Sequence, residues 1–117
     1  MVSLQEIKQI YRNIMEEGGL PYIRCRKCGK IFFFPRHRCP ECGSSDLEIM
    51  KSSMRGKVYA ITRIYREDGV VVYGIAELDE GFRVYCEFDD NMNIGDPVKI
   101  TVKMRDGFPI FLGVKEM

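Results

Sequence analysis

The first pattern of apolar positions along the chain predicts an amphipathic helix. Apolar residues recur at the three- and four-residue spacing of one helix face, at Leu4, Ile7, Tyr11, Ile14 and Met15. Ser3 and Glu6 fit a capping box at the start, and Gly18-Gly19 followed by Pro21 ends the helix. A helix of about 14 residues is marginal alone in water. We therefore expect its apolar stripe to pack against the rest of the chain or another subunit.

The second half of the chain predicts β-strands separated by turns. Runs rich in β-branched and aromatic residues are interrupted by turn sequences such as Glu67-Asp68-Gly69 and Arg105-Asp106-Gly107. The predicted strands span residues 57–66, 70–78, 82–88, 98–104 and 108–114. Five strands in about 60 residues suit a small closed barrel of the oligonucleotide/oligosaccharide-binding (OB) type. An SH3-like barrel is the alternative, and periodicity alone does not separate the two.

Alternation along these strands assigns an inner and an outer face. The residues assigned to the core are Val58, Ala60, Thr62, Ile64, Val70, Val72, Ala76, Leu78, Phe82, Val84, Cys86, Phe88, Val98, Ile100, Val102 and Met104. Cys86 is therefore expected to be a small buried hydrophobe and not a nucleophile. The outer set is unusually apolar and aromatic, and comprises Tyr59, Ile61, Arg63, Tyr65, Val71, Tyr73, Ile75, Arg83 and Tyr85. Such a face exceeds what a soluble monomer usually leaves exposed to water.

Three interpretations of this outer face compete. It is covered by the N-terminal part of the chain, it is a protein interface, or it is a platform on which nucleic-acid bases stack. Tyrosine with arginine suits both interface hot spots and base stacking. Acidic neighbours repel a phosphate backbone, which ranks nucleic acid last: Glu77, Asp79, Glu80, Glu87, Asp89 and Asp90. The interface candidates are Tyr59, Arg63, Tyr65, Tyr73, Arg83 and Tyr85.

Four cysteines predict a closed metal site. They form two motifs separated by ten residues, Cys25-Arg26-Lys27-Cys28-Gly29 and Cys39-Pro40-Glu41-Cys42-Gly43. Two thiolates three residues apart can hold one ion from a tight turn, and the glycine lets the backbone turn sharply. Two such turns complete a tetrahedral four-sulfur site with no open position, which is the structural type of zinc site. We expect one structural Zn²⁺ bound by Cys25, Cys28, Cys39 and Cys42.

Composition and charge narrow the class of protein. The chain has 117 residues, 45% hydrophobic and 30% charged, with a net charge of +1. It contains no apolar run of about 18 residues and no basic-then-apolar start, so we expect a small soluble cytoplasmic protein. Residues 24–54 carry seven basic and three acidic groups, which makes this segment cationic. It could meet a phosphate group or an acidic surface.

The organisation is mainly β: an N-terminal helix in residues 1–22, a four-cysteine zinc ribbon in 23–54, and a five-stranded OB-fold barrel in 55–117. His37 is the one histidine, and it lies between two arginines in a loop. The residues offer no second histidine, no nucleophile context and no Gly-rich phosphate loop. We therefore do not expect an enzyme.

Several motifs together resemble one known family. These are Cys25-x-x-Cys28-Gly29, Phe34-Pro35-Arg36, Cys39-Pro40-x-Cys42-Gly43, Gly74-Ile75-Ala76-Glu77-Leu78-Asp79-Glu80-Gly81 and Ile94-Gly95-Asp96-Pro97-Val98. They resemble, in order and along the whole chain, the acyl-CoA-associated OB-fold family with an N-terminal rubredoxin-like zinc ribbon. The resemblance implies the four-cysteine zinc site and a non-catalytic subunit that works with thiolase-fold enzymes.

In archaea, such members associate with an acetoacetyl-CoA thiolase and a hydroxymethylglutaryl-CoA synthase, in the mevalonate pathway of isoprenoid biosynthesis. The resemblance thus implies a subunit that bridges these enzymes and helps hold or channel acyl-CoA. Because CoA carries three phosphates, Arg36 and Arg38 are candidate contacts through charge-assisted hydrogen bonds. Single-stranded nucleic-acid binding remains the alternative function. Electron transfer would require iron at the four sulfurs.

Overall fold

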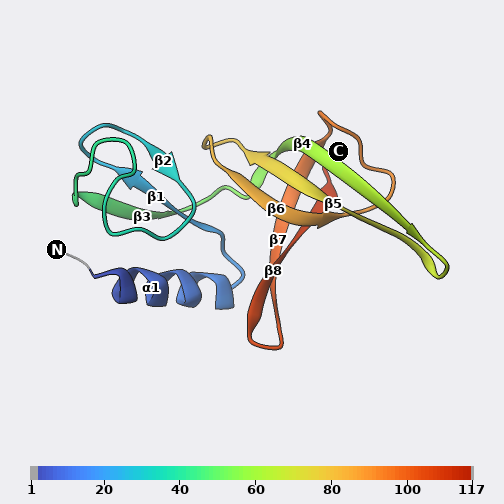
Figure 1. Cartoon of the computed structure of the whole chain (residues 1–117), viewed down its shortest axis with the longest axis horizontal. Coiled ribbons are helices and arrows are strands. Elements are labelled where there is room, and N and C mark those ends of the chain that lie inside the picture. Colours follow the sequence, from blue (N-terminus) through green and yellow to red (C-terminus); the bar gives the residue numbers. More distant parts are fainter. Residues whose placement is uncertain (1–2, 117) are drawn as a thin grey trace.

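The computed structural model describes residues 3–116 as one helix and eight strands, in an elongated molecule measuring 50 × 30 × 23 Å (Figure 1). Met1, Val2 and Met117, which the predicted segments 1–22 and 55–117 include, lie outside the described residues. Helix α1 (Leu4–Glu16) confirms the predicted helix, with Ser3 as its N-cap. The Glu6 amide donates to Ser3 Oγ at 3.2 Å. Gly18 ends the helix with a φ of +88°.

A small antiparallel sheet follows the helix. It comprises β1 (Pro21–Cys25), β2 (Ile31–Phe32) and β3 (Leu47–Lys51) in the order β2-β1-β3. The helix lies along this ribbon sheet, so that Ile7 and Tyr11 pack with Ile23 and Phe32 in one buried cluster. The apolar face of the helix therefore packs against the rest of the same chain. Strands β1 and β3 were not predicted from the sequence.

The remaining strands close into a barrel. They are β4 (Arg55–Arg66), β5 (Gly69–Leu78), β6 (Arg83–Phe88), β7 (Pro97–Arg105) and β8 (Phe108–Lys115). Their order around the barrel is β4-β5-β6-β8-β7, and β7 pairs back onto β4. All pairs are antiparallel except β6 with β8. This order, with a parallel pair between the third and fifth strands, is that of the OB-fold and decides against the SH3-like alternative.

The predicted inner faces of most strands are confirmed. Those of β5, β6 and β7 supply the buried side chains of the barrel core, which are Val72, Ala76, Leu78, Val84, Cys86, Phe88, Val98, Ile100 and Val102. Cys86 is 6% exposed, as expected of a small core residue. Val70 and Met104 belong to the same faces and are half-buried.

The predicted faces of β4 are wrong beyond Val58. A β-bulge at Tyr59 inserts one residue, so that Val58 pairs with Ala76 but Ala60 pairs with Ile75. An extra residue reverses the alternation that follows it. Ala60, Thr62 and Ile64 therefore lie on the outer side of the strand, and Ile61 packs against the core.

Arg63 changes faces for the same reason, so its predicted place on the outer surface is wrong. It pairs with the buried Val72, and its Nη2 donates to the carbonyl oxygens of Asp90, at 3.2 Å, and Met92. The guanidinium thus ties β4 to the loop that follows β6.

The ribbon and the barrel share buried contacts. Leu20 and Tyr22 belong to the barrel core, and the ring of Tyr22 stacks on that of Phe82 with centroids 5.0 Å apart. Residues 52–54, which link β3 to β4, are also attached to the barrel. Ser52 Oγ and the Ser53 amide donate to the Glu80 carboxylate at 2.7 and 2.8 Å. These hydrogen bonds outweigh the effect of burial and lower the pKa of Glu80.

Within residues 3–116, no helix is long and apolar enough to cross a membrane.

Candidate metal centre and protein-binding face

The fold brings the four predicted ligands together. The Sγ atoms of Cys25, Cys28, Cys39 and Cys42 all lie within 4.8 Å of one another. The Cys25–Cys42 and Cys28–Cys39 sulfurs are 3.6 Å apart. A tetrahedral Zn²⁺ with bonds of about 2.3 Å requires sulfurs about 3.8 Å apart. The cluster therefore has the size and donor type of a four-thiolate metal site.

The two cysteine turns have the same backbone geometry. Gly29 and Gly43 adopt φ values of +82° and +77°, which glycine tolerates without a steric penalty. Each glycine amide donates to the carbonyl of the first cysteine of its motif at 2.9 Å. Each turn thus brings the two sulfurs of its own motif close together. The pairing of β1 with β3 then brings the first turn beside the second.

Amide hydrogen bonds favour thiolates at two of the positions. The Cys28 amide lowers the pKa of Cys25 to about 7. At Cys39 burial raises the pKa, but amides of Cys42 and Glu41 outweigh it and lower the pKa overall. The Lys30 amide favours ionisation of Cys28, yet burial and neighbouring sulfurs raise its pKa to about 12. Four adjacent thiolates repel one another, and a bound divalent cation would remove that repulsion.

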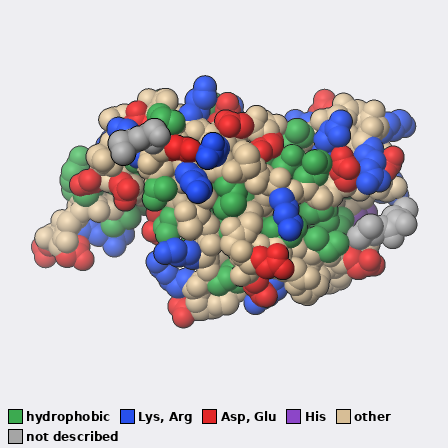
Figure 2. All heavy atoms as spheres, turned by 180° about the vertical axis from the view of Figure 1, so that it is seen from behind, with side chains coloured by type: hydrophobic (Ala, Val, Ile, Leu, Met, Phe, Trp, Pro, Cys, Tyr) green, Lys and Arg blue, Asp and Glu red, His purple; other side chains and the backbone are tan. Residues whose placement is uncertain are grey.

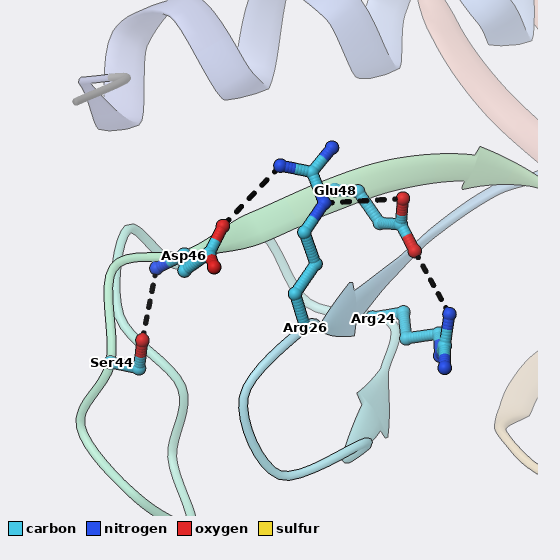
Figure 3. A network of polar contacts seen from close by, with 5 residues as sticks. All are labelled: Arg24, Arg26, Ser44, Asp46 and Glu48. Carbon is cyan, nitrogen blue, oxygen red and sulfur yellow. Dashed lines mark hydrogen bonds and ion pairs between the residues drawn. The ribbon is translucent and has the colours of Figure 1, made fainter.

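An ion-pair network links β1 and the first cysteine turn to β3 and to Asp46 just before it (Figure 3). Arg26, which lies between Cys25 and Cys28 in the chain, contacts Asp46 at 3.3 Å and Glu48 at 3.4 Å. Arg24 contacts Glu48 at 3.1 Å. Two of the seven basic groups in the cationic segment are therefore neutralised locally.

The two CoA-phosphate candidates lie on the loop between β2 and the second cysteine turn. Arg36 and Arg38 are both exposed. Arg38 Nη1 donates to the carbonyl of Gly43 at 3.3 Å, which holds its side chain against the second turn. The position of both residues leaves them accessible to a ligand, and their role stays a prediction.

A groove of about 620 Å³ lies between β6, β8 and the loop after β2. Three predicted interface residues line it, namely Tyr73, Arg83 and Tyr85. Tyr59 is linked to this group because the Arg83 guanidinium carbon lies 3.7 Å from its ring centre. Tyr65 does not line the groove. The bulge moves it off the predicted outer face, because it pairs with Val70, and it lies near the tip of the β4–β5 hairpin with 78% of its surface exposed.

Sequence reasoning missed the residues that complete the groove wall. Phe33 and Phe34 come from the ribbon, and Pro109, Ile110 and Phe111 come from β8. A second groove of about 430 Å³ along α1 shares Phe33, Pro109 and Phe111 with the first. The available signal was the run of three phenylalanines at 32–34, which a ribbon of this size cannot bury entirely. Phe34 is 67% exposed.

Charges of both signs are interspersed over the back of the molecule (Figure 2). Basic and acidic side chains alternate there with small apolar groups, and the projecting β4–β5 hairpin ends in acidic residues. A nucleic-acid footprint would instead require a continuous basic stripe. This view offers no support for the nucleic-acid alternative.

Comparison with known proteins identifies the family. The family described as "ChsH2, rubredoxin-like zinc ribbon domain" matches residues 12–48, which include all four clustered cysteines. A DUF35 domain-containing scaffold protein of Methanothermobacter thermautotrophicus is 30% identical over 111 residues, covering 86% of this chain and 84% of the relative. This chain belongs to the DUF35 family. The family predicted from its motifs is thereby confirmed.

Two further similarities place this DUF35 chain among its relatives. The benzoylsuccinyl-CoA thiolase subunit BbsA of Geobacter metallireducens is 31% identical over 99 residues, covering 76% of this chain and 67% of the relative. The solved structure of an Ltp2-ChsH2(DUF35) aldolase matches with a TM-score of 0.78 and 20% identity, covering 98% of both chains. The structural match concerns the fold.

Proposed function

We propose that this DUF35 chain is a non-catalytic accessory subunit that binds a thiolase-fold enzyme. The observation that carries the proposal is the apolar groove lined by Phe33, Phe34, Tyr73, Tyr85 and Phe111. Aromatic side chains of this kind are typical anchors of protein interfaces, and a large exposed apolar surface marks a binding site. The thiolase subunit and the scaffold protein among the relatives support the choice of partner.

The partners we propose are acetoacetyl-CoA thiolase and hydroxymethylglutaryl-CoA synthase, with the chain bridging them in the mevalonate pathway. Support comes from the motif resemblance. Two grooves that share Phe33 give the chain adjoining surfaces of different character, one on the barrel and one along α1. In this role, the chain supplies position and not chemistry.

The metal we propose is one structural Zn²⁺. Its ligands would be Cys25, Cys28, Cys39 and Cys42, whose four thiolates leave no coordination position for water or substrate. When bound, zinc would cross-link the two cysteine turns. The fifth thiol is unsuited to nucleophilic chemistry, because burial raises the pKa of Cys86 to about 12.

We further propose that Arg36 and Arg38 contact the phosphates of a CoA thioester held jointly with the partner. Guanidinium groups bind phosphate oxygens through paired charge-assisted hydrogen bonds. Both side chains are exposed on the loop that also carries Phe34, so a CoA bound at the partner's surface would meet them at the edge of the interface.

The test is a double substitution, Tyr73→Ala with Tyr85→Ala, assayed by co-purification with the thiolase-fold partner. Both rings are exposed, by 41% and 72%, so the variant should remain folded while its complex weakens. Tyr65→Ala is the matched control, since that ring is exposed outside the groove and its loss should leave binding unchanged. Undiminished binding by the double variant would move the interface elsewhere, with α1 as the next surface to test.

A further inference from the structure

Strands β6 and β8 pair over only part of their length. Their parallel register joins Glu87 to Leu112 and Phe88 to Gly113. Yet β6 stays paired with β5 back to Arg83, and β8 stays paired with β7 back to Phe108. The β7–β8 hairpin therefore projects away from β6, as Figure 1 shows. Within residues 3–116, no strand pairs with the facing edges of 83–86 and 108–111, and the groove lies between them.

The turn at the tip of the β7–β8 hairpin shows which main-chain groups of β8 face the groove. Asp106 and Gly107 both have positive φ, 53° and 82°, as in a two-residue type I′ turn closed by a hydrogen-bonded pair. Main-chain groups alternate between the two edges of a strand. Those of Phe108 and Ile110 thus point to β7, whereas those of Phe111 point to the groove. Pro109 has no N–H, and its main chain faces away from β7, so the β7–β8 ladder loses no hydrogen bond at this position.

The same alternation applies to β6. The Leu78 amide donates to the Phe82 carbonyl at 2.8 Å, which closes the β5–β6 ladder at its turn. Arg83 and Tyr85, the first and third residues after Phe82, then direct their main-chain groups away from β5 and toward the groove. The groove is thus bordered by free main-chain groups on both sides. On β6 these are the amide and carbonyl of Tyr85, and on β8 the amide of Phe111, because the register with Glu87 uses the Phe111 carbonyl.

The side chains that line the groove favour an uncharged occupant. Phe33, Phe34, Tyr85 and Phe111 all line it. Of the two charged side chains, Arg83 is already paired with the Glu77 carboxylate at 3.0 Å and stacked on a tyrosine ring. The other, Glu87, repels anions. The groove therefore offers no unpaired cationic side chain to a phosphate group. An apolar peptide segment could instead contact the aromatic side chains and form main-chain hydrogen bonds with both strand edges.

We propose that an extended apolar segment of the partner enzyme enters the groove and adds a β-strand between β6 and β8. This rests on the proposed function and specifies how the partner is held. Strand addition to an exposed edge obtains affinity from main-chain hydrogen bonds and selectivity from the flanking pockets. The ribbon edges of a second copy of this chain would fit poorly, because β2 has two residues and β3 carries the ion-paired Glu48.

Amide hydrogen exchange in the purified complex tests strand addition directly. The amides of Tyr85 and Phe111 should exchange at least about tenfold more slowly in the complex than in the free protein, because each gains a main-chain acceptor. The amides around the exposed Asp68 at the β4–β5 turn should be unchanged. A complex that forms without slower exchange at Tyr85 and Phe111 would overturn strand addition and leave the proposed function standing. Failure of any complex to form would overturn both.

A pair of substitutions separates the main chain from the ring at the same position. Tyr85→Ala removes the ring and keeps the amide, whereas Tyr85→Pro removes both. The loss of one main-chain hydrogen bond predicts that Tyr85→Pro weakens partner binding by about tenfold more than Tyr85→Ala. Equal weakening by the two variants would overturn the proposal. Should Tyr85→Pro fail to fold, the exchange experiment on the unaltered protein decides.

Discussion

The ring of Phe33 lies parallel to that of Phe82, with centroids 6.0 Å apart and an interplanar angle of 5°. Phe33 comes from the ribbon and Phe82 from the barrel, so this stack holds the two parts together. The Tyr11 hydroxyl donates to the Phe33 carbonyl at 2.6 Å, which brings α1 to the same point. The shape of the groove therefore depends on the position of the ribbon relative to the barrel.

Removal of one metal ligand should disrupt the ribbon. Cys25→Ser is expected to lower metal content from one zinc per chain and to unfold residues 23–54, because structural zinc sites contribute an apparent ~10–16 kcal/mol to folding. Metal analysis and circular dichroism measure the two effects. Since Phe33 and Phe34 line the groove, partner binding should fall as well. A variant with full metal content and unchanged stability would refute the assignment.

Adjacent phenylalanines should separate stability from binding. Phe33→Ala removes a half-buried ring that contacts both parts of the protein, and should lower the free energy of unfolding by about 2 kcal/mol, less than the value for a fully buried ring. Phe34→Ala removes an exposed ring, and should change stability by less than about 0.5 kcal/mol while weakening partner binding. Thermal unfolding and co-purification of both variants give the comparison. Equal loss of stability would show that Phe34 is not a surface contact.

Cys86 should be a core residue independent of the metal. Cys86→Ala is expected to keep the full metal content and to lower the free energy of unfolding by about 1–3 kcal/mol, as a modest core truncation does. In the folded, metal-loaded protein this thiol should react slowly with alkylating reagents, because its side chain is buried. Rapid modification of a fifth thiol would contradict the inner face assigned to β6.

The same thiol predicts an alkaline loss of stability. Burial raises the pKa of Cys86 from 9.0 to about 12. Well below pH 9 the thiol is protonated in both states, whereas between pH 9 and about 12 it is largely ionised only in the unfolded chain. The free energy of unfolding should therefore fall over that interval.

Denaturant unfolding at pH 8 and pH 10 measures this fall, with Cys86→Ala as the control. Burial also raises the pKa of Tyr11 and Tyr22, and these contributions are common to both proteins. The decline should thus be less steep in the variant. Identical slopes would show that Cys86 does not titrate differently in the folded and unfolded states.

The sequence by itself determined the features that depend on neighbouring residues. The helix follows from the spacing of Ile7, Tyr11 and Ile14, since the apolar face of a helix repeats within a few residues. The cysteine turns follow from Cys-x-x-Cys-Gly, because the glycine meets a local backbone requirement. Five strands of the barrel also follow from alternation and turn residues, which are local signals.

Only the tertiary structure decided the features that join distant segments. The bulge at Tyr59 turns Arg63 away from the outer face. A tyrosine is also common at a regular strand position, so the residue at 59 does not reveal the bulge. The docking of Phe33 on Phe82 joins residues 49 positions apart, and the divergence of β8 from β6 depends on where the β7–β8 hairpin is held. These contacts follow from how large elements fit together, for which a run of neighbouring residues carries no periodic signal.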